Sequence, residues 1–279
     1  MISTKKNLTF SNFIIYVVLI VLAIVFTIPF YFIIINSFKT YSEITINSAS
    51  FPTKLNYSNY SRAISQTNFG LVLINTITIT LFSVLGMVIF GSIAAWKLVR
   101  NNSVFSTIMF TIYVASMVIP FQSVMIPLVK VSSNVGLLDH KLGLIFIYWG
   151  FGQAFSVFLF HGFIKGVPLE LEECARLDGC KDFQLFIKIV FPLLKTITIT
   201  VIILQTLWVW NDFLLPSLII YEKTSQTIPL AINRFFGQYK NQWDYALPIL
   251  VLGLLPIVIF FLALQKYMIA GISEGAIKG

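Results

Sequence analysis

The chain has 279 residues, of which 57% are hydrophobic and only 11% are charged, and its formal net charge is +8. Soluble domains carry roughly 25% charged residues, so this composition excludes an ordinary soluble protein and indicates a membrane protein with several spans. The basic residues are scattered between apolar blocks and form no dense patch, which argues against nucleic-acid binding.

Six apolar blocks predict six membrane-spanning helices. A helix rises about 1.5 Å per residue, so crossing about 30 Å of hydrocarbon takes about 20 apolar residues. Helices are expected because unpaired backbone groups are unfavourable in lipid and the alternating pattern of barrel strands is absent. The first block has 23 uncharged residues and no small-residue cleavage site after it, so it is expected to remain as a span. The predicted spans are residues 13–35, 71–95, 105–128, 142–164, 196–220 and 245–265.

Several residues inside these spans predict how the helices bend and pack. A proline removes a backbone hydrogen bond, and small side chains let two helices approach closely. The sequence therefore predicts kinks at four prolines and close packing along the second span. The prolines are Pro29, Pro120, Pro127 and Pro256, and the small residues are Gly86, Gly91, Ser92 and Ala94.

The basic residues favour one orientation in the membrane. With six spans both termini lie on one side, which would carry eleven of the 19 lysines and arginines, against eight on the other side. The shortest loop, residues 97–103, holds two of the eleven. Because cytoplasmic loops are rich in lysine and arginine, both termini are expected in the cytoplasm.

Residues 165–195, between the fourth and fifth predicted spans, form a charged loop on the expected cytoplasmic side. Pro168 suits the first turn of a helix, and three glutamates follow it near the positive end of the helix dipole. Gly179 is expected to end this helix, and Asp182 to cap a second helix that runs to Pro192. The charged loop is therefore predicted to fold as helix, turn, helix. Its glutamates are Glu170, Glu172 and Glu173.

Four apolar residues give the charged loop a surface that water does not favour. Three interpretations remain open for this surface: a helix that lies on the membrane, a loop that packs on its own spans, or a docking site for a second protein. The four residues are Leu177, Phe183, Phe186 and Ile187.

The charged loop resembles the coupling motif of bacterial ABC-importer permeases. That motif reads Glu-Ala-Ala, three residues, Gly, nine residues, and Ile-x-Leu-Pro. Here it reads Glu173-Cys174-Ala175, Gly179 and Ile189-Val190-Phe191-Pro192 at the same spacing, with Cys174 for alanine and Phe191 for leucine. Four other segments resemble the maltose-type carbohydrate branch of this binding-protein-dependent family, so the resemblance covers nearly the whole chain. They are FPTKLNYSNY (51–60), LINTITIT (73–80), TLWVWNDFLLP (206–216) and QKYMIAGISEGAIKG (265–279).

The resemblance implies a fold and a domain organisation. The fold would be the type I ABC importer transmembrane fold, an all-α polytopic membrane protein of six transmembrane helices with a cytoplasmic helix-turn-helix coupling loop at 165–195. Residues 1–70 would hold the cytoplasmic N-terminus, the first span and the first extracellular loop. Residues 71–265 would form the transmembrane domain, and residues 266–279 a cytoplasmic tail.

The resemblance also implies a function and partners. The chain would be a permease subunit in the bacterial cytoplasmic membrane, and with a second permease, as a heterodimer, it would form the pathway for an oligosaccharide or related carbohydrate. Two ATPase subunits would drive import, and an extracellular binding protein would deliver the solute. The sequence has no Gly-x-x-x-x-Gly-Lys-Ser/Thr phosphate loop, so ATP and Mg²⁺ are expected on the partner ATPase, with no cofactor and no enzymatic activity on this chain.

Eight residues of the charged loop are implied to couple the chain to the ATPase. Glu173 would make a polar contact with it, Ala175 would stay small for close approach, and Gly179 would supply the bend. ATP binding would close the ATPases, carry the coupling loops together and turn the pathway outward. The eight residues are Glu172, Glu173, Cys174, Ala175, Asp178, Gly179, Ile189 and Pro192.

Two further groups of candidates lie outside the charged loop. In the fifth predicted span, Trp210, Asn211 and Asp212 are candidates for the solute pathway, because an intramembrane carboxylate usually marks function. For Asp212 the alternative is a structural hydrogen bond. Trp208 and Trp210 could stack on sugar rings, and the alternative for both is an interfacial anchor. By resemblance, the long loop 221–246 would reach toward the binding protein, and an ordered cap over the sixth span is the alternative. Its candidate contacts are Arg234, Phe235, Phe236 and Gln238.

Other functions predict features that the sequence shows weakly or lacks. A secondary transporter often has internal repeats and several charges at mid-membrane, whereas one such carboxylate and no clear repeat are found here. An importer permease for another solute, such as glycerol-phosphate, remains open. An intramembrane enzyme would need a catalytic or metal cluster, and neither His140 and His161 nor Cys174 and Cys180 form one at a recognisable spacing.

Overall fold

The computed structural model describes the backbone of residues 10–237 and 241–276 and the side chains of residues 12–237 and 241–267. Within these ranges every regular element is a helix, and one isolated β-bridge joins Phe236 and Asn241. The all-α prediction is therefore confirmed. The chain divides into two compact units, one made of the chain up to Thr67 with Arg234–Leu252, the other of Asn68–Asn233 with the chain from Gly253 on.

Among the described residues, four single helices are long and apolar enough to cross a bilayer. They correspond to the predicted spans 13–35, 71–95, 142–164 and 245–265, and each extends past the predicted limits or matches them within one residue. These helices are α1 (Phe10–Ser37), α4 (Phe69–Arg100), α7 (Lys141–Ile164) and α14 (Trp243–Ala276). Among the shorter helices are α2 (Tyr41–Ile46), α3 (Ser58–Thr67), α12 (Leu214–Ile219), η2 (Lys223–Ser225) and α13 (Ile228–Asn233).

The third predicted span is a pair of helices rather than one kinked helix. α5 (Val104–Ser116) and α6 (Phe121–Asn134) are bent by 104° across the break between them. Pro120 is the N-cap residue of α6, and it disfavours a helical conformation in the residue before it. The proline therefore ends the first helix, which is a larger effect than the predicted kink.

The fifth predicted span is also divided. α11 (Lys195–Asn211) ends before Asp212, and α12 begins at Leu214. A separate bend of 78° lies between the helical residues Asp182–Leu193 and α11, just before the predicted span. The prediction of one continuous helix over 196–220 is wrong, because residues 212 and 213 lie outside both helices. The carboxylate of Asp212 accepts the backbone N–H of Leu214, the first residue of α12. With each bent pair taken as one span, the number of spans reaches six.

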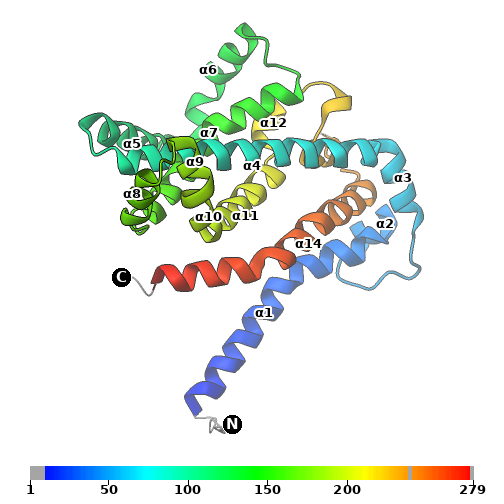
Figure 1. The fold of residues 1–279 in the computed structure, drawn as a ribbon. Helices are drawn as coiled ribbons and strands as arrows, with labels where there is room; N and C mark the ends of the chain where they lie inside the picture. The colour runs from blue at the N-terminus through cyan, green and yellow to red at the C-terminus, as the bar shows by residue number, and fades with distance from the viewer. Residues whose placement is uncertain (1–9, 238–240, 277–279) are drawn as a thin grey trace. The chain divides into compact units, whose positions relative to one another are not determined.

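α4 is the central helix of the second unit and runs alongside α7 and α11 (Figure 1). Two of the predicted small residues explain how closely α4 and α7 approach. A methyl group at Gly91 would come 2.9 Å from Cβ of Ser156, and one at Gly86 would overlap the ring of Trp149. Glycine is thus required at both positions for the observed helix contact, as predicted.

The first unit contains a polar turn directly after α1. The side chain of Lys39 is fully buried, and its ammonium group donates hydrogen bonds of 3.1 Å and 3.2 Å to the carbonyl oxygens of Asn47 and Ser48. Burial lowers the pKa of Lys39, while the nearby carboxylate of Glu43 acts in the opposite direction. Asn59 donates a hydrogen bond of 2.7 Å to the carbonyl of Lys39. These bonds tie the residues on either side of α2 to the end of α1 and to α3.

Candidate functional site

The first half of the charged loop (residues 165–195) folds as predicted. α8 (Glu170–Leu177) has three glutamates in its first turn, where they meet the positive end of the helix dipole. Gly179 follows this helix with a φ of +86°, a backbone conformation that favours glycine. Gly179 therefore sets the turn between α8 and the helical residues that follow.

The second half of the charged loop is less regular than predicted. It consists of α9 (Asp182–Leu185), the π-helical segment η1 (Phe186–Val190) and α10 (Phe191–Leu193). Pro192 lacks the N–H that would bond back to the preceding turn, which explains the local change of helix type. The N-cap residue of α9 is Lys181, so the prediction that Asp182 caps this helix is wrong.

The apolar surface of the charged loop is smaller than predicted. The side chains of Leu177 and Phe183 are 88% and 73% exposed, and Ile187 is also exposed. Phe186, by contrast, is only 6% exposed and packs on the indole of Trp96 in α4, with ring centroids 5.3 Å apart. The predicted surface therefore contains three of the four residues, and the fourth holds the loop on its own span.

The eight predicted coupling residues of the charged loop divide into an exposed and a buried group. Glu172 and Ala175 are 1% and 7% exposed, and Ile189 packs against the same apolar cluster as Ala175. The small side chain at Ala175 thus serves packing within this chain, since Leu185 and Val190 belong to that cluster. The exposed predicted coupling residues are Glu173, Cys174, Asp178, Gly179 and Pro192.

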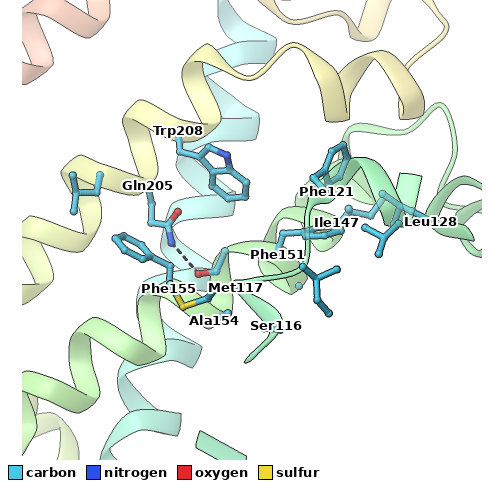
Figure 2. A pocket seen from close by; sticks show the side chains of 15 residues that line it. Ser116, Met117, Phe121, Leu128, Ile147, Phe151, Ala154, Phe155, Gln205 and Trp208 are labelled. Atoms are coloured by element: carbon cyan, nitrogen blue, oxygen red, sulfur yellow. Dashed lines mark hydrogen bonds between the residues drawn. The ribbon is translucent and has the colours of Figure 1, made fainter. Parts of the chain in front are cut away.

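A cavity of about 810 Å³ opens beside the break between α5 and α6. Its walls come from these two helices, from α7 and from α11, and aromatic rings form much of its surface (Figure 2). The rings belong to Phe121, Phe151, Phe155 and Trp208. The break between α5 and α6 therefore lies beside a mostly apolar cavity, and Gln205 supplies an amide to its wall.

Gln205 and Trp208 point from α11 into this cavity (Figure 2). The amide nitrogen of Gln205 donates hydrogen bonds of 2.9 Å to the carbonyl of Gly152 and 2.9 Å to the hydroxyl of Ser156. The indole of Trp208 is 39% exposed, and its ring meets that of Tyr148 edge to face at 5.5 Å. Contacts with α7 thus hold both side chains in place, so α7 positions the part of the cavity wall that α11 contributes.

The three predicted pathway residues do not line this cavity. Trp210 is 7% exposed, and its indole N–H donates a hydrogen bond of 3.2 Å to the carbonyl of Gly253. Asp212 accepts a hydrogen bond of 2.9 Å from the hydroxyl of Tyr148, which agrees with the structural alternative for this residue. Asn211 is exposed and bonds back to the carbonyl of Leu207 in its own helix.

The sequence contained a signal for the cavity residues. Gln205 is a polar residue in an apolar run, and Trp208 lies three positions later. Residues three apart on a helix share a face, so these two side chains belong to one surface. The adjacent pair Asn211 and Asp212 is more polar, and for that reason the solute pathway was predicted about one turn beyond Gln205 and Trp208.

The long loop 221–246 begins with a firm attachment inside the second unit. The amide nitrogen of Asn75 donates hydrogen bonds of 2.8 Å and 3.1 Å to the carbonyl oxygens of Thr224 and Gln226. The hydroxyl of Thr76 accepts the backbone N–H of Ile228 at 3.0 Å. The end of α4 that carries Asn75 and Thr76 therefore orders the start of this loop.

The residues predicted to contact a binding protein lie in the first unit and differ in exposure. Arg234 is exposed, and Phe236 is 37% exposed. Phe235 is only 6% exposed and stacks on the ring of Tyr245 at 5.6 Å, so it is not free to meet a partner. Gln238 lies outside the described residues.

Residues 87–274 match the family model described as the inner membrane component of binding-protein-dependent transport systems. The chain belongs to this family. It is therefore a membrane-embedded, multi-pass component of a transport system and not an enzyme. As a permease of an ABC import system it acts together with ATPase, further permease and solute-binding subunits.

Several curated members of the family resemble the chain along almost its whole length. It is 43% identical to the probable starch degradation products transport system permease protein AmyC of Thermoanaerobacterium thermosulfurigenes, over 93% of this chain and 94% of the relative. It is 37% identical to the melibiose/raffinose/stachyose import permease protein MelC of Bacillus subtilis, over 90% and 91%. It is 36% identical to the multiple sugar-binding transport system permease protein MsmG of Streptococcus mutans, over 98% and 100%.

A solved structure has the same fold. It is the crystal structure of a bacterial ABC transporter involved in the import of the acidic polysaccharide alginate. The two chains superpose with a TM-score of 0.81 at 20% sequence identity, over 96% of this chain and 99% of the other. The predicted type I importer fold is therefore confirmed.

Proposed function

We propose that the chain carries an oligosaccharide or a related carbohydrate across the bacterial cytoplasmic membrane, as one permease of an ATP-driven importer. The observation that carries this proposal is the set of relatives at 43%, 37% and 36% identity, whose names state starch degradation products, melibiose/raffinose/stachyose and multiple sugars. Relatives this similar over nearly their whole length usually transport the same class of solute.

The cavity beside the α5–α6 break supports a carbohydrate as the solute. Its volume, about 810 Å³, is in the usual range for a small-molecule site. Trp208 offers an aromatic face on which the apolar face of a sugar ring can stack, and Gln205 supplies an amide that can hydrogen-bond a hydroxyl group. A second permease would complete the wall of the pathway, and the expected arrangement is a heterodimer.

The charged loop is proposed to face the cytoplasm and to dock on an ATPase. Both termini then lie in the cytoplasm, as the distribution of basic residues favours. The docking surface would consist of the exposed coupling residues, flanked by Leu177 and Phe183: Glu173, Cys174, Asp178, Gly179 and Pro192. Two ATPase subunits would bind ATP and Mg²⁺, and their closure would move the loop.

The remaining assignments follow from this orientation. Residues 1–70, 71–265 and 266–279 would form the N-terminal part, the transmembrane domain and the cytoplasmic tail. The first unit would then expose Arg234 and Phe236 on the outer side, where a binding protein delivers the solute.

The test is uptake by proteoliposomes that contain the chain with its partner permease, its ATPases and its binding protein. Radiolabelled maltotriose or raffinose should accumulate only when ATP reaches the ATPases, and Trp208→Ala should lower the uptake about tenfold through loss of stacking. Uptake of glycerol 3-phosphate in place of both saccharides would show a different solute class. Uptake by this chain alone, driven by an ion gradient, would overturn the proposal.

A further inference from the structure

The carboxylate of Glu172 in α8 is bound on both oxygens by the last turns of α4. The indole N–H of Trp96 donates to one oxygen at 2.9 Å, and Nε of Arg100 donates to the other at 2.7 Å. The guanidinium of Arg100 also donates from Nη2 to the carbonyl of Val167 at 2.9 Å. Glu172 is 1% exposed, so this network lies inside the chain and not on the surface that a partner would meet.

A buried ion pair of this kind is an inefficient way to gain stability. Removing two charges from water is unfavourable, and apolar residues of similar volume often stabilise a core as well or better. The network of Glu172, Trp96 and Arg100 provides a defined geometry, because two donors in fixed directions bind one carboxylate. The network therefore determines the position and the rotation of α8 relative to α4.

The other contacts between α4 and the charged loop are less specific. Phe186 meets Trp96 through ring packing, which is non-directional and tolerates sliding. Lys97 pairs with Asp182 at the surface, where the two side chains are 53% and 50% exposed, and such pairs contribute little. Glu172 is thus the point at which α8 is tied to α4 in a defined geometry.

We propose that Glu172 is a positioning residue through which a displacement of the charged loop is passed to α4. This inference rests on the proposed docking of the charged loop on an ATPase. It gives Glu172 a different role from the exposed Glu173: Glu173 meets the ATPase, and Glu172 ties the loop to the span that has to move.

The experiment compares Glu172→Gln with Lys97→Met in the complete transporter reconstituted in proteoliposomes. Glutamine keeps the shape and an acceptor for Trp96 but removes the charge that pairs with Arg100. In Glu172→Gln the amount of ATPase bound should stay within twofold of wild type, and the ATP hydrolysed per solute imported should rise about tenfold, a usual size for coupling between sites. Lys97→Met removes a cation from the neighbouring position of α4, but from an exposed pair, so this ratio should stay within twofold.

Arg100→Gln and the double variant Arg100→Gln/Glu172→Gln complete the test. The two residues act as one unit, so the double variant should raise the ratio no further than either single variant does. A purely structural role would instead lower the melting temperature and the amount of assembled complex, with the ratio unchanged. An unchanged ratio in Glu172→Gln overturns the inference.

Two further variants separate this inference from the proposed function. Glu173→Lys should prevent docking on the ATPase; if it leaves both docking and import at wild-type levels, the proposed role of the charged loop fails. If Glu173→Lys uncouples transport and Glu172→Gln does not, only the assignment of Glu172 fails.

A further variant is needed if Glu172→Gln does not assemble. Trp96→Phe then serves as the test, because it removes one hydrogen-bond donor to Glu172 and keeps an aromatic ring against Phe186. A wild-type ratio in Trp96→Phe would then overturn the inference.

Discussion

The hydroxyl group of Tyr148 donates a hydrogen bond of 2.9 Å to the carboxylate of Asp212. Tyr148 is fully buried, and its ring lies edge to face against Trp208, with centroids 5.5 Å apart. The other oxygen of Asp212 accepts the backbone N–H of Leu214 at 2.9 Å. Asp212 therefore supports the indole that lines the cavity, although it does not line the cavity itself.

This arrangement predicts a graded response to substitution of Asp212. Asp212→Ala removes the partner of Tyr148 and the acceptor for the first backbone N–H of α12 together, so we expect a loss of about 2–3 kcal/mol in the free energy of unfolding. Asp212→Asn keeps an acceptor for Leu214 and a polar partner for Tyr148, so the loss should be about 1 kcal/mol. Thermal unfolding of the purified complex measures both. Equal melting temperatures for the two variants would contradict a dual role of the carboxylate.

Substitution of Gln205 should alter the handling of the solute. Gln205→Leu removes the amide from the cavity wall, so we expect the KM for uptake to rise about 5- to 20-fold, as for the loss of one or two hydrogen bonds. Ser156→Ala is the matched control, because it removes one hydrogen-bond partner of Gln205 without changing the cavity lining. Its KM should stay within twofold of wild type. A Gln205→Leu variant with wild-type kinetics would exclude the amide from the pathway.

Gly179 and Gly136 offer a matched pair for testing the turn in the charged loop. Both have a positive φ, of +86° and +70°, and a methyl group at either position would meet nothing within 4 Å. Gly179→Ala and Gly136→Ala should therefore lower the free energy of unfolding by a similar amount, about 1–2 kcal/mol, through backbone strain alone. Only Gly179→Ala should raise the ATP hydrolysed per solute. The same ratio in both variants would show that the turn at Gly179 has no special role.

The contact between α4 and α7 predicts opposite effects for two glycine substitutions. A methyl group at Gly86 would overlap the ring of Trp149, whose N–H donates a hydrogen bond of 3.0 Å to the carbonyl of Phe82. Gly86→Ala should therefore destabilise the chain by about 1–3 kcal/mol. Gly162 of α7 has open space around it, so Gly162→Ala should stabilise the helix by up to about 1 kcal/mol. Unfolding in denaturant would show the difference, and equal midpoints would refute the close packing.

The long spans could be predicted from the sequence because their signal is local. An uncharged run such as residues 13–35 has the length and composition that a bilayer demands, and no distant residue can change that requirement. The same signal did not reveal the break at Pro120, since the apolar run continues on both sides of it. The length of the apolar run predicted one span, whereas the structure has two helices, α5 and α6, at 104° to each other.

The buried network at Glu172 could not be predicted in this way. A charged residue in the first turn of a short polar helix is expected to be exposed, because its sequence neighbours are polar and its charge suits the helix N-terminus. Its partners Trp96 and Arg100 lie 76 and 72 positions away in the chain, so the burial arises from tertiary packing alone. Local patterns therefore located the charged loop and its turn, but they did not separate the residues that face outward from those that hold the loop in place.

α4 is a continuous helix of 32 residues without a proline, about 48 Å long at 1.5 Å per residue. Asn75 and Thr76 hold the loop at one end, and Trp96 and Arg100 hold α8 at the other. A helix resists stretching, so a shift of the attachment at one end of α4 also displaces the attachment at the other end. Solute arriving outside and nucleotide binding inside would then influence each other equally, as thermodynamic linkage requires of any two coupled binding events.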